Sequence, residues 1–327
     1  MRGLSRASAP AKVILFGEHF VVYDKLAVVM AVDLRAHVSV KPRMDNKIIV
    51  ESIGMGLQGE FTLDGVYKPI IGEFGEDKLR PIYVAAKRVL DLAGESIGLN
   101  ITVDSRIPVA SGLGSSAAVL VATTAAVGSL LEMNLCRDDI FRLALEAEKI
   151  IHEKPSGVDP AISTYGGLIA YSRSGGVMML EAAANLPLVI GDTRIKRDTR
   201  EMIHRVSELR RLYPEIFKGL MDAGDRVARL AVEAIRAGDL RALGHLMNIN
   251  HALLYAIGVS NTAIESLLWA ARRAGALGAK ITGAGGGGCI VALSMPEDRR
   301  RIAEAIRVTG GEPLIADIAH EGVRIEE

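Results

Sequence analysis

The chain has 327 residues, more than the roughly 250 to 300 that one hydrophobic core supports, so we expect two domains. Lys and Arg together number 39, as do Asp and Glu, and this zero formal charge gives no reason to expect nucleic acid or an anionic membrane as partner. We therefore expect a small-molecule partner. The cysteines, Cys136 and Cys289, are too far apart to indicate a metal site or a disulfide framework, and no signal peptide is recognisable, which favours a cytoplasmic location.

Hydrophobic periodicity predicts an α+β protein in which strands and helices are mixed without strict alternation. Strands are expected at 11–16, 27–40, 48–51, 61–63, 100–107, 168–171, 177–180 and 186–192, and again after the glycine run 283–288. Helices are expected at 81–93, 115–131, 138–152 and 296–308, and helical patterns dominate 199–272. The composition changes near 182–185, so the predicted domains are 1–184 and 185–327.

The stretch 107–131 contains no charged residue and is long enough to suggest a membrane helix, which needs roughly 20 apolar residues. Pro108, Gly112 and Gly114 interrupt its first part, however, so only the rest can be a continuous helix. A glycine loop that leads into a buried helix fits better. Such a loop brings backbone N–H groups together at the positive end of a helix, and a phosphate is the natural ligand of that arrangement.

Two known phosphate-binding motifs also contain glycines at similar spacing. A P-loop needs a lysine after its last glycine, and Ala117 and Ala118 follow the serines here, so it is excluded. The dinucleotide fingerprint G-x-G-x-x-[GA] is matched by Gly112, Gly114 and Ala117, but it should be followed by a helix and then a strand, whereas a second helix follows. The loop could also be a tight turn that enters a core helix and binds nothing, and this alternative stays open.

The polar residues outside the loop each have an ordinary structural explanation. Asp159 precedes Pro160, which is typical of a helix N-cap followed by the first helical residue. Lys12 is compatible with a solvated strand end, and Glu148 with the solvent face of its helix. None of these residues alone indicates a catalytic site.

Four motifs change this when taken together: AKVILFGEH, PVASGLGSSAA, PSGVDPAISTYGG and KITGAGGGGC. Their order and separations resemble those of the GHMP kinase superfamily, and within it the members that phosphorylate mevalonate. The resemblance covers nearly the whole chain. It implies a two-domain GHMP kinase fold, with an N-terminal domain like ribosomal protein S5 that contains a left-handed βαβ unit, a ferredoxin-like C-terminal domain, and ATP bound between them.

The resemblance also implies roles for matched positions. The residues expected to bind the nucleotide are Pro108, Ala110, Ser111, Gly112, Leu113, Gly114, Ser115, Ser116 and Ala117. Ser116 and Glu148 would hold Mg²⁺, the implied cofactor, while Asp159 would be the catalytic base and Lys12 would lie beside the reacting hydroxyl. The expected substrate contacts are Glu18, His19, Thr199 and Gly285. Whether Asp159 is a true base or a positioning charge stays open.

The activity implied is ATP-dependent phosphorylation of the primary (5-) hydroxyl of mevalonate to 5-phosphomevalonate, in isoprenoid biosynthesis. The alternatives are a sister kinase that acts on phosphomevalonate, on the 3-hydroxyl of mevalonate or on homoserine, and a non-catalytic relative that binds nucleotide. A non-catalytic relative would not need Lys12, Glu148 and Asp159 together. The partners expected are ATP and mevalonate, with no nucleic acid and no membrane, and the sequence leaves a homodimer open.

Overall fold

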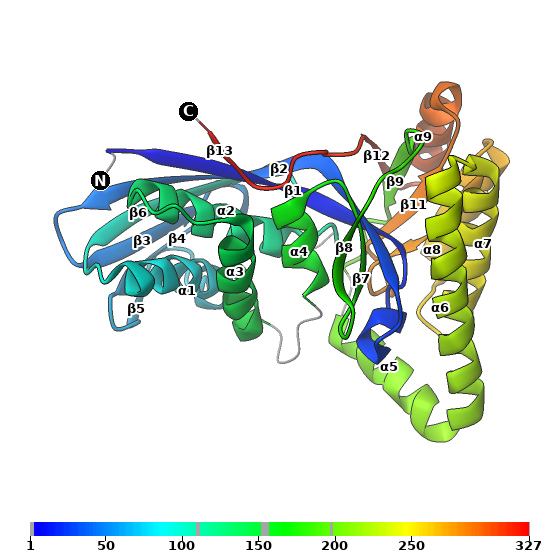
Figure 1. Ribbon diagram of the computed structural model, residues 1–327, viewed down its shortest axis with the longest axis horizontal. Coiled ribbons are helices and arrows are strands. Elements are labelled where there is room, and N and C mark those ends of the chain that lie inside the picture. The colour runs from blue at the N-terminus through cyan, green and yellow to red at the C-terminus, as the bar shows by residue number, and fades with distance from the viewer. Residues whose placement is uncertain (1–2, 109–111, 152–156, 197–198, 327) are drawn as a thin grey trace.

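The computed structural model describes residues 3–108, 112–151, 157–196 and 199–326 of the chain. Figure 1 shows a large sheet with helices beneath it on the left, and a smaller sheet flanked by long helices on the right. The two termini of the chain lie on the same side, at the end of the large sheet. The fold is α+β, as the sequence predicts.

The large sheet has nine strands, in the order β13-β1-β2-β6-β3-β4-β5 with β7 and β8 joined to the side of β2. Its strands are β1 (Ser5–Phe16), β2 (Ala27–Arg43), β3 (Lys47–Ser52), β4 (Leu57–Thr62), β5 (Tyr67–Ile71), β6 (Gly98–Ser105), β7 (Leu168–Ser172), β8 (Gly176–Leu180) and β13 (Arg324–Glu326). Only the β3–β6 pair among them is parallel. The length of β2 lets it pair with β7 near its start and with β6 near its end.

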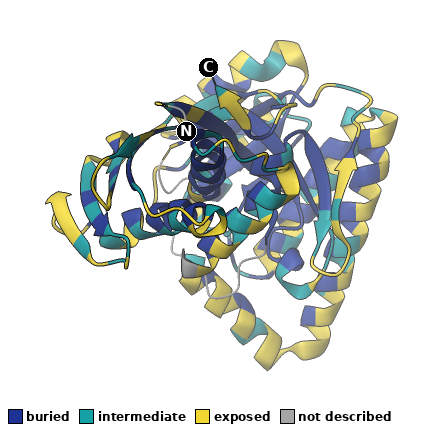
Figure 2. Ribbon diagram, turned by 60° about the vertical axis from the view of Figure 1, so that its left-hand side comes forward, coloured by how far each residue is buried: buried dark blue, intermediate teal, exposed yellow. Residues whose placement is uncertain are grey.

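Helices α1 (Glu76–Ala93) and α2 (Ser115–Leu130) cover one face of this sheet. Helix α3 (Arg137–Ile151) packs against both of them, and α4 (Val158–Tyr165) lies beside α2 against β1 and β2. Every residue of α2 from 117 to 128 is buried, which confirms the predicted core helix (Figure 2). The hydroxyl groups of its two buried threonines, Thr123 and Thr124, donate to Val119 O and Leu120 O in the preceding turn, so neither hydroxyl is left without a partner. Within the described residues, no helix is both long and apolar enough to cross a bilayer.

The smaller sheet has the antiparallel order β10-β11-β9-β12. Its strands are β9 (Leu188–Asp192), β10 (Gly278–Thr282), β11 (Cys289–Leu293) and β12 (Glu312–Ala316). The accompanying helices are α5 (Thr199–Leu212), α6 (Pro214–Ala237), α7 (Leu240–Ala256), α8 (Thr262–Arg273) and α9 (Arg299–Val308). A strand, a helical segment, two strands, a helix and a final strand follow one another, which is the ferredoxin-like βαββαβ order.

Several boundaries differ from the prediction. Helix α1 begins at Glu76, and Pro81 lies inside it, where we expected the helix to start. The predicted 296–308 helix is divided into a 3-10 turn, η3 (Pro296–Asp298), and α9. Strands β5, β10, β12 and β13 were not predicted, and β13 returns to the large sheet beside β1. The predicted boundary at 184/185 lies between β8 and β9, where the chain passes from one sheet to the other, and it stays a prediction.

The two halves interlock through Phe20 of the 3-10 helix η1 (Phe20–Tyr23). A second 3-10 helix, η2 (Ile53–Met55), contacts β6. Phe20 is fully buried and belongs to the hydrophobic cluster of the smaller sheet and its helices, although η1 directly follows the β1 region. Helix α6 approaches the ring at Gly224, where a Cβ atom would lie 2.7 Å from Phe20 Cδ1. The absence of a side chain at Gly224 therefore permits this contact.

We expect Gly224→Ala to destabilise the protein, although alanine favours a helix over glycine by about 1 kcal/mol. The added methyl group would displace the Phe20 ring, and overpacking of this kind costs about 1 to 3 kcal/mol. The midpoint of thermal unfolding, followed by circular dichroism, should fall. Gly219→Ala is the matched control, because Gly219 lies in the same helix and a Cβ there would meet nothing within 4 Å. Equal stability of the two variants would contradict this account of the Phe20 contact.

Candidate active site

The glycine loop before α2 is bound to the middle of β1. Lys12 donates its backbone N–H to Leu113 O at 2.8 Å, and Leu113 is buried. Gly114 has φ of 77°, and a Cβ there would lie 2.8 Å from Lys12 Cγ. Glycine is required at this position by both the left-handed backbone and the contact with Lys12.

Helix α2 begins at this loop with the features of an anion site. Gly114 is its N-cap and supplies no side chain, so the N–H groups of the first turn have no partner within the helix. Ser115 and Ser116 occupy this turn, and Ser116 is exposed, whereas Ala117 is buried. The partial positive charge of a helix N-terminus favours a phosphate here. Pro108 is exposed, and the predicted contacts Ala110 and Ser111 lie outside the described residues.

Lys12 forms an ion pair with Asp159, with 3.0 Å between Lys12 Nζ and Asp159 Oδ1. The lysine side chain is 5% exposed and the aspartate 31%, so the carboxylate can be reached from solvent while the ammonium is shielded. Asp159 does not cap its helix, α4 (Val158–Tyr165), because Gly157 is the N-cap. The helix-cap interpretation of Asp159 was therefore wrong, and its carboxylate is directed to Lys12 instead.

Glu148 lies beside this pair on α3. It is 7% exposed, and its Oε2 atom is buried with no hydrogen-bond partner in the described residues. Burial, and then the nearby Asp159 charge, raise the pKa of Glu148 to about 8, while Lys12 opposes the shift. A buried carboxylate with an unused oxygen, beside a second carboxylate, is suited to a hard divalent cation such as Mg²⁺.

The second glycine run joins β10 to β11 and contacts the end of β1. His19 donates from Nε2 to Ala284 O at 2.8 Å, and burial lowers its pKa, so the ring is neutral at pH 7. Gly285 has φ of 76°, and a Cβ there would lie 2.2 Å from Val259 O. The loop is therefore held tightly by the N-terminal half of the chain and by the segment before α8.

Glu18 is placed differently from its neighbour His19. Its side chain is 0% exposed and is fully engaged: Oε1 pairs with Lys280 Nζ, and Oε2 accepts from Asn250 Nδ2 at 3.1 Å. The predicted substrate contact at Glu18 is not tested by these bonds, but they leave its carboxylate no free surface. Thr199 is the first residue of α5 and is partly buried.

Sequence reasoning missed Lys280. It lies in the buried strand β10, between the apolar Ala279 and Ile281 and three residues before Gly283. A charged residue within a buried run signals an internal partner, because lysine is almost never fully buried without one. This signal was available from the sequence.

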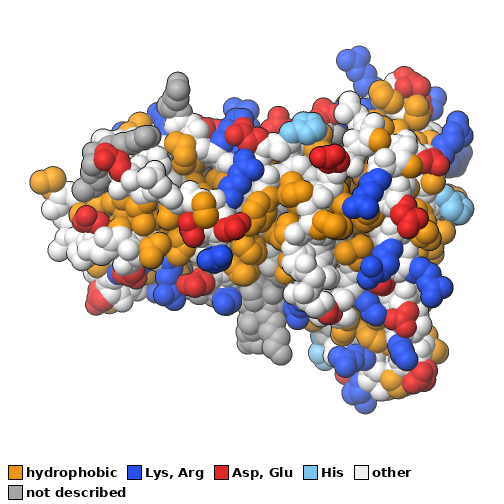
Figure 3. Space-filling model, in the orientation of Figure 1, with side chains coloured by type: hydrophobic (Ala, Val, Ile, Leu, Met, Phe, Trp, Pro, Cys, Tyr) orange, Lys and Arg blue, Asp and Glu red, His pale blue; other side chains and the backbone are white. Residues whose placement is uncertain are grey.

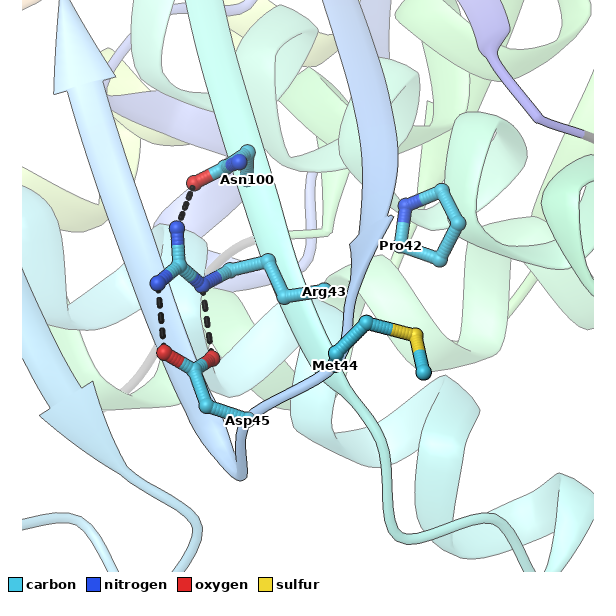
Figure 4. Close-up of a pocket in the computed structure, with 5 residues that line it drawn as sticks. All are labelled: Pro42, Arg43, Met44, Asp45 and Asn100. Atoms are coloured by element: carbon cyan, nitrogen blue, oxygen red, sulfur yellow. Dashed lines mark hydrogen bonds and ion pairs between the residues drawn. The ribbon is translucent and has the colours of Figure 1, made fainter.

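A hollow of about 450 Å³ lies at the far end of β2 (Figure 4). There the Arg43 guanidinium donates to both carboxylate oxygens of Asp45 and to Asn100 Oδ1, so it is already satisfied. On the face shown in Figure 3, basic and acidic side chains are interspersed. Neither feature competes with the Lys12 region as a candidate site.

Comparison with known proteins agrees with this geometry. The family model of the GHMP kinases N terminal domain matches residues 80–167, and that of the GHMP kinases C terminal matches residues 231–310. The mevalonate kinase of Pyrococcus furiosus is 41% identical over 330 residues, which cover 98% of each chain.

Two solved structures have the same fold over nearly their whole length. The mevalonate kinase of L. major in complex with R-mevalonate has a TM-score of 0.82 at 30% identity, covering 95% of this chain and 94% of that one. The mevalonate kinase of Methanococcus jannaschii has a TM-score of 0.84 at 26% identity, covering 96% of this chain and 98% of that one. The chain belongs to the GHMP kinase family.

Proposed function

We propose that this kinase transfers the γ-phosphoryl group of ATP to the primary (5-) hydroxyl of mevalonate, giving 5-phosphomevalonate for isoprenoid biosynthesis in the cytoplasm. The observation that carries the proposal is the Lys12–Asp159 pair at 3.0 Å, next to a helix N-terminus suited to phosphate. The full-length relatives that are mevalonate kinases support the choice of acceptor.

Phosphoryl transfer depends on in-line positioning and on neutralising the phosphate charge. In this proposal the first-turn N–H groups of α2 and the loop from Gly112 to Gly114 bind the triphosphate. Ser116 and Glu148 would hold Mg²⁺, which when bound shields the phosphate oxygens. The unpaired Glu148 oxygen supports that role.

The acceptor hydroxyl would lie against the exposed part of Asp159. A carboxylate can accept the hydroxyl proton as transfer proceeds, and the Lys12 ammonium holds that carboxylate in one orientation. The ammonium would also stabilise the negative charge that develops on the attacking oxygen. His19, with its Nε2–H committed to Ala284 O, would contact the substrate through the remaining faces of its ring.

The second candidate acceptor, phosphomevalonate, would bring a dianion towards Asp159 and would need further basic residues. The only basic cluster suggested for this purpose is Arg194, Lys196, Arg197 and Arg200. Arg194 is exposed and is paired with Glu312, which reduces its value as a phosphate ligand. Arg197 lies outside the described residues. This favours the unphosphorylated acceptor.

We expect Asp159→Asn to fold and to bind MgATP, but to lower kcat about 100-fold or more, because the substitution keeps the shape and removes the base. A coupled ATPase assay with mevalonate measures this. Asp77→Asn is the matched control, since Asp77 occupies the same second helical position of α1 after an N-cap glycine and is exposed. A near-normal kcat for Asp159→Asn would overturn the assigned role.

The pKa of about 8 for Glu148 predicts a pH-dependent Mg²⁺ requirement. Below that pH the carboxyl group must lose a proton before it can bind the metal, so the half-saturating Mg²⁺ concentration should fall as the pH rises from 6.5 to 8.5. Glu148→Gln should raise the requirement and remove this part of the pH dependence, leaving only that of the nucleotide. Glu146→Gln, on the exposed face of the same helix, should behave as the unmodified protein. Identical Mg²⁺ titrations for both variants would exclude Glu148 as a ligand.

Product identification tests the acceptor. With mevalonate, mevalonate 5-phosphate and homoserine offered separately, we expect mevalonate to be turned over most efficiently, and phosphorus NMR of the product to show a phosphate on the primary carbon. A 3-phosphate, or turnover of the 5-phosphate alone, would contradict the proposal.

A further inference from the structure

Lys280 is fully buried, and two of its three hydrogen bonds join β10 to the β1 region. Its ammonium donates to Glu18 Oε1, to Ile281 O and, at 3.4 Å, to Ile14 O. Three donors therefore meet three acceptors, two of which belong to the β1 region. Burial lowers the pKa of Lys280, and the charge of Glu18 opposes that shift.

Two side chains of β10 form hydrogen bonds with the backbone N–H and C=O groups of Ile14 in β1. Its N–H donates to Thr282 Oγ1 at 2.9 Å, and its C=O accepts from Lys280. Side chains at alternate positions of a strand point to the same side, so Lys280 and Thr282 both face β1. Two residues further on, Ala284 O accepts from His19. We call this set of contacts the β1–β10 seam.

The seam lies between the two parts of the candidate active site. Lys12 is two residues before Ile14 on the same strand, a distance of about 7 Å. On the other strand, the glycine loop 283–288 directly follows Thr282. A shift of one strand along the other would therefore change the position of Lys12 relative to that loop.

We propose that Lys280 is a positioning residue for phosphoryl transfer, which fixes the β1–β10 seam through Glu18 and Ile14 and so sets the glycine loop 283–288 relative to Lys12. The proposal rests on the proposed kinase function and extends it to a residue remote from the reacting atoms. Glu18 then acts through Lys280, and its carboxylate does not touch the acceptor.

A contribution to stability alone explains these contacts less well. Removing two charges from water is costly, and a buried ion pair is often no more stable than a well-packed apolar pair. The neighbours of Lys280 on β10 are apolar and fully buried, so an apolar residue would also suit the strand. A directional ammonium with three fixed acceptors defines the alignment of two strands, which an apolar contact does not.

The test compares Glu18→Gln/Lys280→Met, which removes both charges together, with the unmodified protein. We expect kcat for mevalonate to fall about 10- to 100-fold, the cost of a small misplacement of catalytic groups, while the Kd for MgATP stays unchanged. Hydrogen exchange at 283–288 should become faster.

Arg272→Met is the matched control, because Arg272 donates to Ala279 O of the same strand from α8 without touching β1. It should leave kcat and loop exchange unchanged. Normal kcat in the double variant, or a reduced kcat with unaltered loop exchange, would overturn the proposal.

If the double variant fails to fold, Thr282→Val tests the seam instead, because this substitution removes only the hydroxyl that accepts from the Ile14 N–H. Lower kcat with faster loop exchange would support the seam, and no change in either would overturn it. If the unmodified protein does not phosphorylate mevalonate, the proposed function fails, and the seam is judged from loop exchange alone.

Discussion

The ion pair between Lys12 and Asp159 is the contact on which the arrangement of the candidate active site depends. A nearly buried ammonium is costly unless it is paired, so the position of Lys12 requires a carboxylate within reach. Helix α4 supplies that carboxylate, and the backbone of Lys12 binds the loop that starts α2. One residue of β1 thereby fixes the relative positions of a strand, a helix and the glycine loop before α2.

The glycines of the motifs are required by contacts within the protein as well as by any ligand. Gly114 leaves room for the Lys12 side chain, and Gly157, with φ of 81°, leaves room for Tyr171, whose Oη would lie 2.8 Å from an added Cβ. A glycine-rich sequence thus allows the catalytic elements to approach one another closely. The glycines can be recognised in the sequence, but the side chains that approach them, such as Lys12 and Tyr171, are known only from the folded structure.

Much of the fold follows from local sequence patterns. The helix predicted at 115–131 is confirmed as α2, because so apolar a segment is stable only in a buried position. Strand β13 could not be predicted, because three residues, two of them charged, form a strand only when β1 offers a free edge. Pro81 misplaced the start of α1, because proline is tolerated early within a helix as well as at its first residue. The Lys12–Asp159 pairing likewise depends on the tertiary fold.

Glu18 and Glu148 are both buried, but their hydrogen bonds differ, and this difference indicates different roles that the sequence alone does not distinguish. As whole residues, Glu18 and Glu148 are nearly equally inaccessible, at 6% and 7% exposed. Glu18 has both oxygens satisfied by protein groups, so its charge is used within the fold. Glu148 keeps one oxygen without a partner among the described residues and has a raised pKa, so its negative charge is costly in the protein alone. The stability of the fold therefore accounts for the position of Glu18, but it does not account for an unsatisfied carboxylate beside that of Asp159.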